Sequence, residues 1–271
     1  MKEMFMANET MSATANGFDF WIPLPAQSDV RQFDRIAAGG RDGTALWGVA
    51  TGGAVWRWNQ RAWEPVPTQP EVSNFSQVSV GGDDGTVVWA VATGGALWRW
   101  NGRAWESVLT QPEVSNFSQV SVGGADGSTI WAVATGGAVW RWNGAKWDKI
   151  PTQSNVSSFS QVSVSGDGSA IWAVATGGAV WQWREGDWIR VQPQADVQSF
   201  SQVSVGGPGG SVVWGVANGG AVWRRQASLW VQVPAQDNVS RFRQVAVSGA
   251  DGSTIWAVAE GGAVWVRGRQ V

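Results

Sequence analysis

The sequence lacks the side chains that enzymes use most often. Its 271 residues include no cysteine and no histidine. Disulfides, thiol nucleophiles and metal sites built on cysteine or histidine are therefore excluded. A nucleophile with its base would depend on lysine, and only Lys2, Lys146 and Lys149 are present. Paired carboxylates of a glycosidase are the remaining option, but the acids follow a repeat instead of gathering at one place. We expect no enzymatic activity and no cofactor.

Charge and long apolar runs are also scarce. Charged residues make up 15% of the chain and the formal net charge is −2, which gives no attraction to nucleic acid or to acidic membranes. No apolar run reaches the ~18 residues of a transmembrane helix, and the first residues lack the apolar core of a signal peptide. We therefore expect a cytoplasmic protein that neither binds nucleic acid nor inserts into membranes.

The aromatic residues are uneven in type and regular in position. The chain has 22 Trp, 9 Phe and no Tyr. One Trp series recurs at intervals of 42, 42, 41, 42 and 42 residues, at Trp47, Trp89, Trp131, Trp172, Trp214 and Trp256. Around Trp89 the sequence is VVWAVATGGALWRWNGRAW. Its β-branched and aromatic runs predict short strands, and its Gly-Gly and Asn-Gly pairs predict hairpin turns between them.

Six copies of this pattern predict a six-bladed β-propeller, an all-β fold with four antiparallel strands per blade. The repeats start near residues 29, 71, 113, 155, 196 and 238, each with a Phe-bearing strand, first at residues 29–38, that we place nearest the axis. Residues 18–271 form the propeller, and residues 1–17 are expected to be a mobile tail, with a short helix or an oligomer contact as alternatives.

A second Trp series indicates how the ring closes. It comprises Trp21, Trp63, Trp105, Trp147, Trp188 and Trp230, and it begins the outermost strand of each blade. The last repeat ends one residue before its own member would occur. We therefore expect residues 18–25 to supply the missing outer strand of the last blade, so that the ring has no open sheet edge there.

Most tryptophans are expected to lie in the core, because the series of Trp89, Trp98 and Trp105 occur in every repeat. A further series occurs in only four repeats, at Trp58, Trp100, Trp142 and Trp183, and gives way to Arg225 and Arg267 in the last two. Buried core positions rarely accept arginine. We therefore expect this series to be exposed near the outer end of the third strand, where it binds a ligand or packs under a loop.

Polar residues flank this Trp series. Arginine precedes it at Arg57, Arg99 and Arg141, and asparagine follows it at Asn59, Asn101 and Asn143. An aromatic face beside amide and guanidinium groups suits a sugar. Alternatively, asparagine only forms the turn and arginine is a solvated charge on a strand edge. We favour this alternative for asparagine, and for arginine both interpretations stay open.

Two further sets of polar residues recur. The loops between blades carry a second candidate set, Asn74 and Asn116 with Ser73, Ser115, Ser157, Ser158, Gln198 and Ser199. Gln77, Gln119, Gln161, Gln202 and Gln244 precede the inner-strand valines and either bond to backbone or line the axis; we favour the bonding role. The Asp-Gly turns each offer one carboxylate, too few for calcium, so we predict no metal site.

The repeat VSVG, then VWAVATGG, then a short strand ending in Arg or Trp and a lone Trp, resembles the tectonin repeat over residues 18–271. Tectonin-domain proteins include β-propeller lectins. The resemblance implies glycan binding without catalysis, and the repeated sites predict a multivalent lectin that agglutinates glycan-bearing particles. Its implied ligands are surface glycans of bacteria or invertebrates, with O-methylated mannose or fucose foremost, in a defence role. The alternative from the residues is a protein-interaction scaffold, and a homo-oligomer is compatible with either function.

Overall fold

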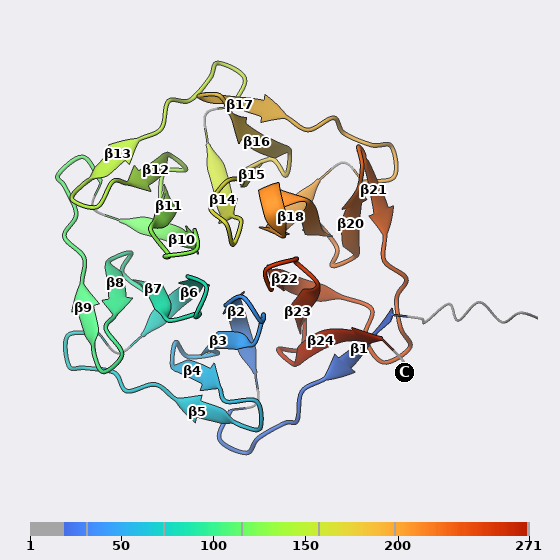
Figure 1. Ribbon diagram of the computed structural model, residues 1–271, viewed down its shortest axis with the longest axis horizontal. Helices are drawn as coiled ribbons and strands as arrows, with labels where there is room; N and C mark the ends of the chain where they lie inside the picture. The colour runs from blue at the N-terminus through green and yellow to red at the C-terminus, as the bar shows by residue number, and fades with distance from the viewer. Residues whose placement is uncertain are drawn as a thin grey trace, which may run out of the picture.

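Six four-stranded antiparallel sheets surround a central axis in the computed structural model (Figure 1). The structure describes residues 19–269 except 31, 73, 115, 157 and 198. Each sheet is one blade, with its first strand nearest the axis and its last strand on the outside. The predicted six-bladed β-propeller is therefore confirmed. The predicted tail of residues 1–17 lies outside the described residues.

The strands follow chain order from the axis outward. Blades 1 and 2 contain β2 (Phe33–Gly39), β3 (Ala45–Ala50), β4 (Val55–Trp58) and β5 (Trp63–Pro65), then β6 (Phe75–Gly81), β7 (Val87–Ala92), β8 (Leu97–Trp100) and β9 (Trp105–Ser107). Blades 3 and 4 contain β10 (Phe117–Gly123), β11 (Thr129–Ala134), β12 (Val139–Trp142) and β13 (Trp147–Lys149), then β14 (Phe159–Val164), β15 (Ile171–Ala175), β16 (Val180–Arg184) and β17 (Asp187–Arg190). Blade 5 contains β18 (Phe200–Gly206), β19 (Val212–Ala217), β20 (Val222–Gln226) and β21 (Leu229–Gln232).

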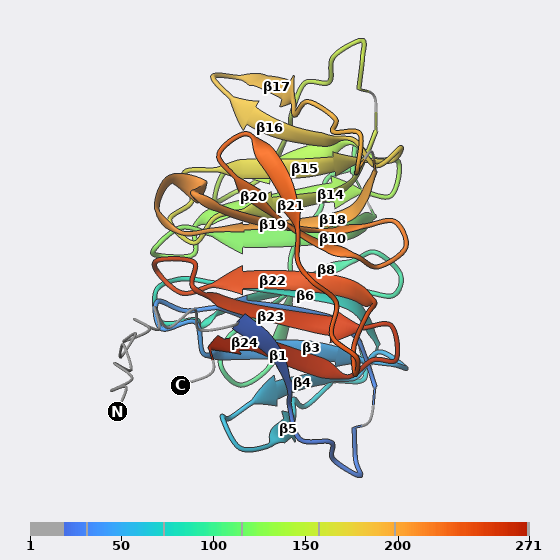
Figure 2. The same cartoon turned by 90° about the vertical axis from the view of Figure 1, so that its right-hand side faces the viewer.

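Blade 6 combines the two ends of the chain. It contains β22 (Phe242–Ser248), β23 (Thr254–Ala259), β24 (Val264–Arg269) and, as its outer strand, β1 (Asp19–Pro23). Trp21 pairs with Arg267, and Figure 2 shows β1 running beside β24. The predicted ring closure is thus confirmed. Its strand is residues 19–23 within the predicted 18–25, of which Phe18 lies outside the described residues.

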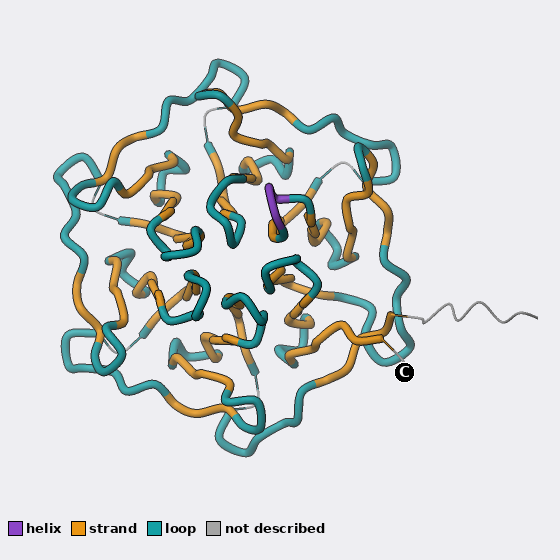
Figure 3. Tube along the Cα trace, in the orientation of Figure 1, coloured by secondary structure: helices purple, strands orange, loops and turns teal. Residues whose placement is uncertain are grey.

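The inner strands begin later than the sequence pattern predicts. The expected strand at residues 29–38 starts only at Phe33. In blade 2 the preceding residues form a turn, in which Gln69 and Val72 bond to each other through their backbones. The first part of each repeat is therefore a linker and not a strand, as the teal segments around the outside of Figure 3 show.

Neighbouring blades pack a face with large side chains against one with small side chains. Trp47 and Val49 of blade 1 lie in one buried cluster with Val88 and Ala90 of blade 2. The same arrangement recurs at the following boundary, where Trp89 and blade 3 residues share a cluster. Trp105 is only 2% exposed. The structure confirms that the Trp89 and Trp105 series are core residues, and burial of large indole surfaces is what holds the blades together.

Side chains also link the inner strands around the axis. The Gln77 amide donates to the carbonyl of Val120 in the next blade at 3.0 Å and accepts from its N–H at 3.1 Å. Ser79 accepts the N–H of Val122 at 2.9 Å. Equivalent bonds to the next blade come from Gln119, Gln161, Gln202 and Gln244. These glutamines therefore satisfy the backbone of an otherwise unpaired strand edge, as favoured from the sequence.

Candidate functional site

The predicted site residues lie at two opposite ends of the sheets. Val88 pairs with Trp100, so the Trp100 series lies at the end that carries the turns after the first and third strands, here called the turn face. Asn74 lies at the other end, where its carbonyl accepts the N–H of Thr93 at 3.0 Å. That end, here called the linker face, carries the Gly-Gly turns and the linkers between blades. The structure therefore does not bring Asn74 and Asn116 together with the predicted Trp, Arg and Asn residues.

The Trp100 series is less exposed than the sequence predicted. Trp58 is 9% exposed, and Trp100, Trp142 and Trp183 are only partly exposed. The Trp100 ring centroid lies 5.2 Å from that of Trp105 in its own blade and 6.3 Å from that of Trp47 in the preceding blade. The expected place at the end of the third strand is correct, but the expected exposure is wrong. These indoles pack between blades.

Arginine replaces tryptophan here because the position is lined by aromatic rings. The Arg225 guanidinium lies 5.4 Å from the ring centroid of Trp172 and 5.9 Å from that of Trp230. Arg267 lies over Trp214 and Trp21 in the same way. A guanidinium can stack on these rings, and Nη1 of Arg225 is buried there without a hydrogen-bond partner among the described residues. Burial, and then nearby Arg184, lower the pKa of Arg225.

The arginines next to this series face the following blade. Arg57 lies directly opposite Trp47 in the β3–β4 pair, so both side chains share one sheet face. Trp47 contacts Trp100 of blade 2, whereas Trp58 projects from the opposite face of its own strand. Arg57 therefore accompanies Trp100 and not its sequence neighbour. By the same register, Arg99 accompanies Trp142, and Arg141 accompanies Trp183.

Each of these arginines faces a carboxylate on the outer strand that the sequence analysis did not single out. Arg57 forms an ion pair with Glu64 at 3.2 Å, and Arg99 one with Glu106 at 3.8 Å. Asp148 stands opposite Arg141 in the register of β12 and β13, but its ion pair is with Lys146 at 3.5 Å. The side chains of Arg57 and Glu64 are 56% and 47% exposed, so the pair is open to solvent. The sequence contains a pattern that could have identified these acids, because each one directly follows the outer-strand Trp.

The asparagines organise the turn beside these pairs. The Asn101 side-chain oxygen accepts the N–H groups of Arg103 at 2.9 Å and Ala104 at 2.8 Å, and its amide donates to Glu106 at 2.6 Å. Gly102 adopts a φ of 94°, which glycine allows most readily. Asn59 and Asn143 make the same contacts in blades 1 and 3. Their turn-forming role is confirmed. Hydrogen bonding from Asn59, and then from Arg57, lowers the pKa of Glu64.

Three consecutive blade boundaries thus share a constellation, here called the boundary clusters. Their members are Arg57, Glu64 and Trp100; Arg99, Glu106 and Trp142; and Arg141, Asp148 and Trp183. The other three boundaries differ. Ile189, Val231 and Ile22 occupy the acid position there, with exposures of 49%, 37% and 38%. At this outer-strand position the side chain is therefore acidic in blades 1–3 and aliphatic in blades 4–6.

The linker face carries a different pattern. The hydroxyl groups of Thr93 and Thr135 donate to the carbonyls of Asn74 and Asn116 at 3.3 and 3.4 Å. Where blade 6 meets blade 1, charged groups replace these small polar ones. Arg243 pairs with Asp34 across that boundary at 2.9 Å. Ser73, Ser115, Ser157 and Gln198 of the second candidate set lie outside the described residues.

The Asp-Gly turns use their carboxylates locally. Asp84 accepts the backbone N–H of Thr86 at 3.0 Å and its hydroxyl at 2.9 Å. Asp42 and Asp126 also accept from the residue two positions later. Within the described part of the chain, no three carboxylates gather in a way that could hold a metal ion. Nor do these residues form a helix long and apolar enough to cross a membrane.

Similarity to known proteins is confined to structure. No protein-family model and no curated protein sequence matches the chain. The solved structure of YCF48 bound to D1 peptide matches with a TM-score of 0.58 and 18% identity, over 92% of this chain and 82% of that one. YCF48 from Cyanidioschyzon merolae matches with 0.56 and 18%, over 92% and 88%. BBS1N in complex with ARL6DN matches with 0.56 and 12%, over 82% and 74%. At these identities the similarity shows the propeller fold alone.

Proposed function

We propose that this propeller is a multivalent carbohydrate-binding protein whose boundary clusters hold the sugars. The observation that carries the proposal is the recurrence of arginine, carboxylate and partly exposed indole at three consecutive boundaries. Core packing does not require it, because the other three boundaries pack with aliphatic residues at the acid position. Repetition of half-exposed polar groups beside an aromatic ring is a pattern that a repeated ligand explains.

The chemistry of each cluster matches a sugar. The carboxylate accepts hydrogen bonds from hydroxyl groups and the guanidinium donates to their oxygens. The exposed edge of the indole provides apolar contact for C–H groups. An O-methyl group on mannose or fucose would add apolar area at that edge. We take surface glycans of bacteria or invertebrates as the ligands, in a defence role, on the resemblance to tectonin repeats.

Multivalency would supply the affinity. Exposed ion pairs and one indole edge make a weak single site, but several sites that engage one surface raise the effective concentration of the rest. The protein should therefore agglutinate glycan-bearing particles far more strongly than it binds a free monosaccharide. Of the four predicted tryptophans, Trp58 has no such cluster, because it packs with Trp256 of blade 6, where Val266 and Ile22 occupy the arginine and acid positions. Three equivalent sites are expected.

The test combines a glycan array, including O-methylated mannose and fucose, with agglutination of glycan-coated beads. The variant Glu64→Gln, Glu106→Gln, Asp148→Asn removes the three carboxylates without changing side-chain size. We expect it to lose glycan binding while its thermal melt stays close to that of the parent. The control Glu71→Gln, Glu113→Gln changes exposed linker acids outside the clusters and should bind normally. Unchanged binding by the triple variant would overturn this assignment of the sites.

The alternative function is a protein-interaction scaffold, and one observation favours it. Ile22, Ile189, Leu229 and Val231 are exposed on the outer strands of blades 4–6. Two structurally similar propellers were solved with a peptide or with a protein, as the D1 peptide and ARL6DN complexes show. A scaffold would bind one partner at fixed stoichiometry, without competition from sugars. A blank glycan array for a well-folded parent would favour this alternative.

A further inference from the structure

The turn face is hollowed at the axis. Turns between the first and second strands surround a pocket of about 330 Å³. Its floor is a ring of valines from five blades, Val80, Val122, Val164, Val205 and Val247. The same valines line the top of a narrower channel of about 80 Å³ that contains the glutamine amides. The pocket is therefore a shallow cup with an apolar floor above a polar channel.

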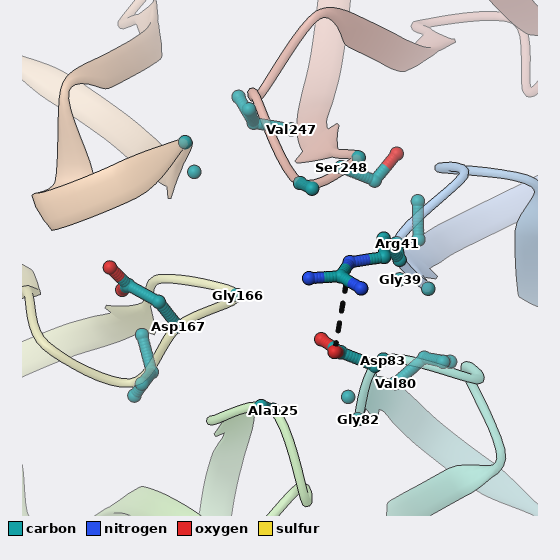
Figure 4. Close-up of a pocket in the computed structure, with 18 of the residues that line it drawn as sticks. Gly39, Arg41, Val80, Gly82, Asp83, Ala125, Gly166, Asp167, Val247 and Ser248 are labelled. Atoms are coloured by element: carbon teal, nitrogen blue, oxygen red, sulfur yellow. Dashed lines mark ion pairs between the residues drawn. The ribbon is translucent and has the colours of Figure 1, made fainter.

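The charges at the rim of this axial pocket are asymmetric. One repeat position provides Arg41, Asp83, Ala125, Pro208 and Ala250 to the rim, and the blade 4 turn, which is one residue shorter, provides Gly166. Only Arg41 and Asp83 are charged at this position. Figure 4 shows the Arg41 guanidinium projecting over the pocket towards Asp83. At this repeat position the charges thus lie on one side of a pocket on a near-sixfold axis, which favours one orientation of a bound ligand.

The two charged residues have a fixed backbone. The N–H of Arg41 donates to the Asp83 carbonyl at 2.7 Å, and the N–H of Asp83 donates to the Ala125 carbonyl at 2.7 Å. The N–H of Ala250 donates to the Arg41 carbonyl at 2.8 Å. Neighbouring turns therefore hold both Cα atoms in place, and only the side chains need to move when a ligand arrives. This arrangement lowers the entropy cost of binding.

The ion pair between Arg41 and Asp83 can open so that both side chains bind a ligand instead. The Arg41 Nε and Asp83 Oδ2 atoms are 3.8 Å apart, and the two side chains are 73% and 51% exposed. Such a pair contributes little to stability. Asp167, across the pocket, is already engaged by the Ser165 hydroxyl at 2.6 Å and the Gly209 N–H at 2.7 Å. The acceptor and donor open to a ligand are therefore Asp83 and Arg41.

We propose that the axial pocket binds a free α-amino acid with an aliphatic or aromatic side chain. Its carboxylate binds Arg41, its ammonium group binds Asp83, and its side chain rests on the valine floor. The ligand must carry its carboxylate and its ammonium group on the same carbon atom, because Arg41 and Asp83 lie side by side. Its size is small, since the volume lies at the lower end of the about 300–1,000 Å³ typical of ligand pockets. A neutral sugar could hydrogen-bond to both side chains, but it brings no opposite charge to either of them.

The experiment is isothermal titration calorimetry of the full chain with L-leucine at millimolar concentrations. Leucinamide, which lacks the carboxylate, and 4-methylpentanoate, which lacks the ammonium group, should each bind at least tenfold more weakly. Glycine, which lacks the side chain, should also bind at least tenfold more weakly. The boundary-cluster variant Glu106→Gln should bind L-leucine as the parent does, which separates this site from the proposed sugar sites.

Two alanine variants test which side chain binds which charged group of the ligand. Arg41→Ala and Asp83→Ala introduce the residue that Ala125 and Ala250 already supply at the same repeat position. We expect Arg41→Ala to lose the preference for leucine over leucinamide, and Asp83→Ala to lose the preference over 4-methylpentanoate. Arg41→Gln and Asp83→Asn repeat the test should either alanine variant misfold. The proposal is overturned if L-leucine produces no heat above buffer, or if the variants bind it as tightly as the parent.

Discussion

At the scale of the residue, one position shows how an aromatic environment accepts two unlike side chains. Trp100 packs against Trp105 and Trp47, and Arg225 occupies the same repeat position over Trp230 and Trp172. Both a flat indole and a flat guanidinium fit between two rings. The loss of tryptophan in blades 5 and 6 is therefore a change of contact type and not evidence of an exposed site.

This equivalence predicts that Trp100→Arg is tolerated. The new guanidinium would lie between Trp47 and Trp105, as Arg225 does between its own pair. We expect it to lower the free energy of unfolding far less than Trp105→Ala, which opens a cavity at a fully buried site and should cost about 3–5 kcal/mol. Chemical denaturation of the two variants measures the difference. Equal losses would show that the position depends on the indole itself.

Asp167 predicts a pH-dependent contribution to stability. Burial opposes its ionisation, but hydrogen bonds from Ser165, Gly209 and Ser169 prevail and lower its pKa to about 2. Because the folded pKa is depressed, the contribution is fully present above the ordinary value near 3.8 and is lost as the pH falls through about 2. Asp167→Asn should be less stable than the parent at pH 7, and the difference should shrink between pH 4 and pH 2.

Denaturant unfolding of both proteins across that pH range measures this effect. Asp237→Asn, the same acid-to-amide change on an exposed linker, is the matched control at pH 7, where it should change stability little. A gap between Asp167→Asn and the parent that stays constant down to pH 2 would contradict the assignment.

At the scale of the element, the inner strands are joined sideways by side chains instead of by a continuous backbone ladder. Gln77 and Ser79 supply these bonds from blade 2 to blade 3. Blade 1 has Arg35 and Ala37 at the same repeat positions. A guanidinium and a methyl group carry no acceptor, so the N–H groups of the facing strand β6 cannot be bonded in this way. The ring of side-chain bonds is interrupted between blades 1 and 2.

Restoring the two side chains should stabilise the propeller. Arg35→Gln and Ala37→Ser would give blade 1 the same acceptors as blades 2–5, and a typical hydrogen bond contributes about 0.5–1.5 kcal/mol. We expect the double variant to raise the midpoint of thermal unfolding. The reverse changes in blade 3, Gln119→Arg and Ser121→Ala, should lower it. If the blade 1 variant melts at or below the parent temperature, Arg35 has a role that glutamine cannot replace.

Most of the fold follows from the sequence because the repeat supplies it six times. The turns at Gly94-Gly95 and Asn101-Gly102 and the position of Trp21 predict the strands and the closure. The candidate site was harder, because residues adjacent in sequence project from opposite faces of a strand. Arg57 and Trp58 therefore belong to different boundaries. Strand order could have shown that Asn101 and Asn116 lie at opposite sheet ends. Asn101 follows a third strand and Asn116 precedes a first strand, and the first and third strands of a blade run in the same direction. The sequence does not show which face of a blade meets the next blade, so it could not predict that Arg57 lies beside Trp100 of blade 2.

At the scale of the whole molecule, the ring of blades is closed by one short strand from the start of the chain. Blade 6 takes its outer strand β1 from the start of the chain. Trp21, only 2% exposed, lies 4.7 Å from Phe242 between ring centroids, and the Gln236 side chain bonds to its backbone N–H and carbonyl. Arg267 also stacks on Trp21. Five residues thus join the two ends of a ring whose other joints are continuous in sequence.

This closure predicts that β1 can be removed and replaced in trans. Deleting residues 1–25 exposes the edge of β24 and the apolar surface that Trp21 covers, so the shortened protein should melt at a lower temperature and self-associate through the open edge. The synthetic peptide of residues 18–25, FDFWIPLP, should pair with β24 and restore the stability and the association state of the parent. The same peptide with alanine for Trp21 should restore much less, because it lacks the buried indole. Thermal melts and light scattering with increasing peptide distinguish these outcomes. A shortened protein that melts with the parent and associates no more than the parent would show that the remaining blades hold the ring closed without this strand.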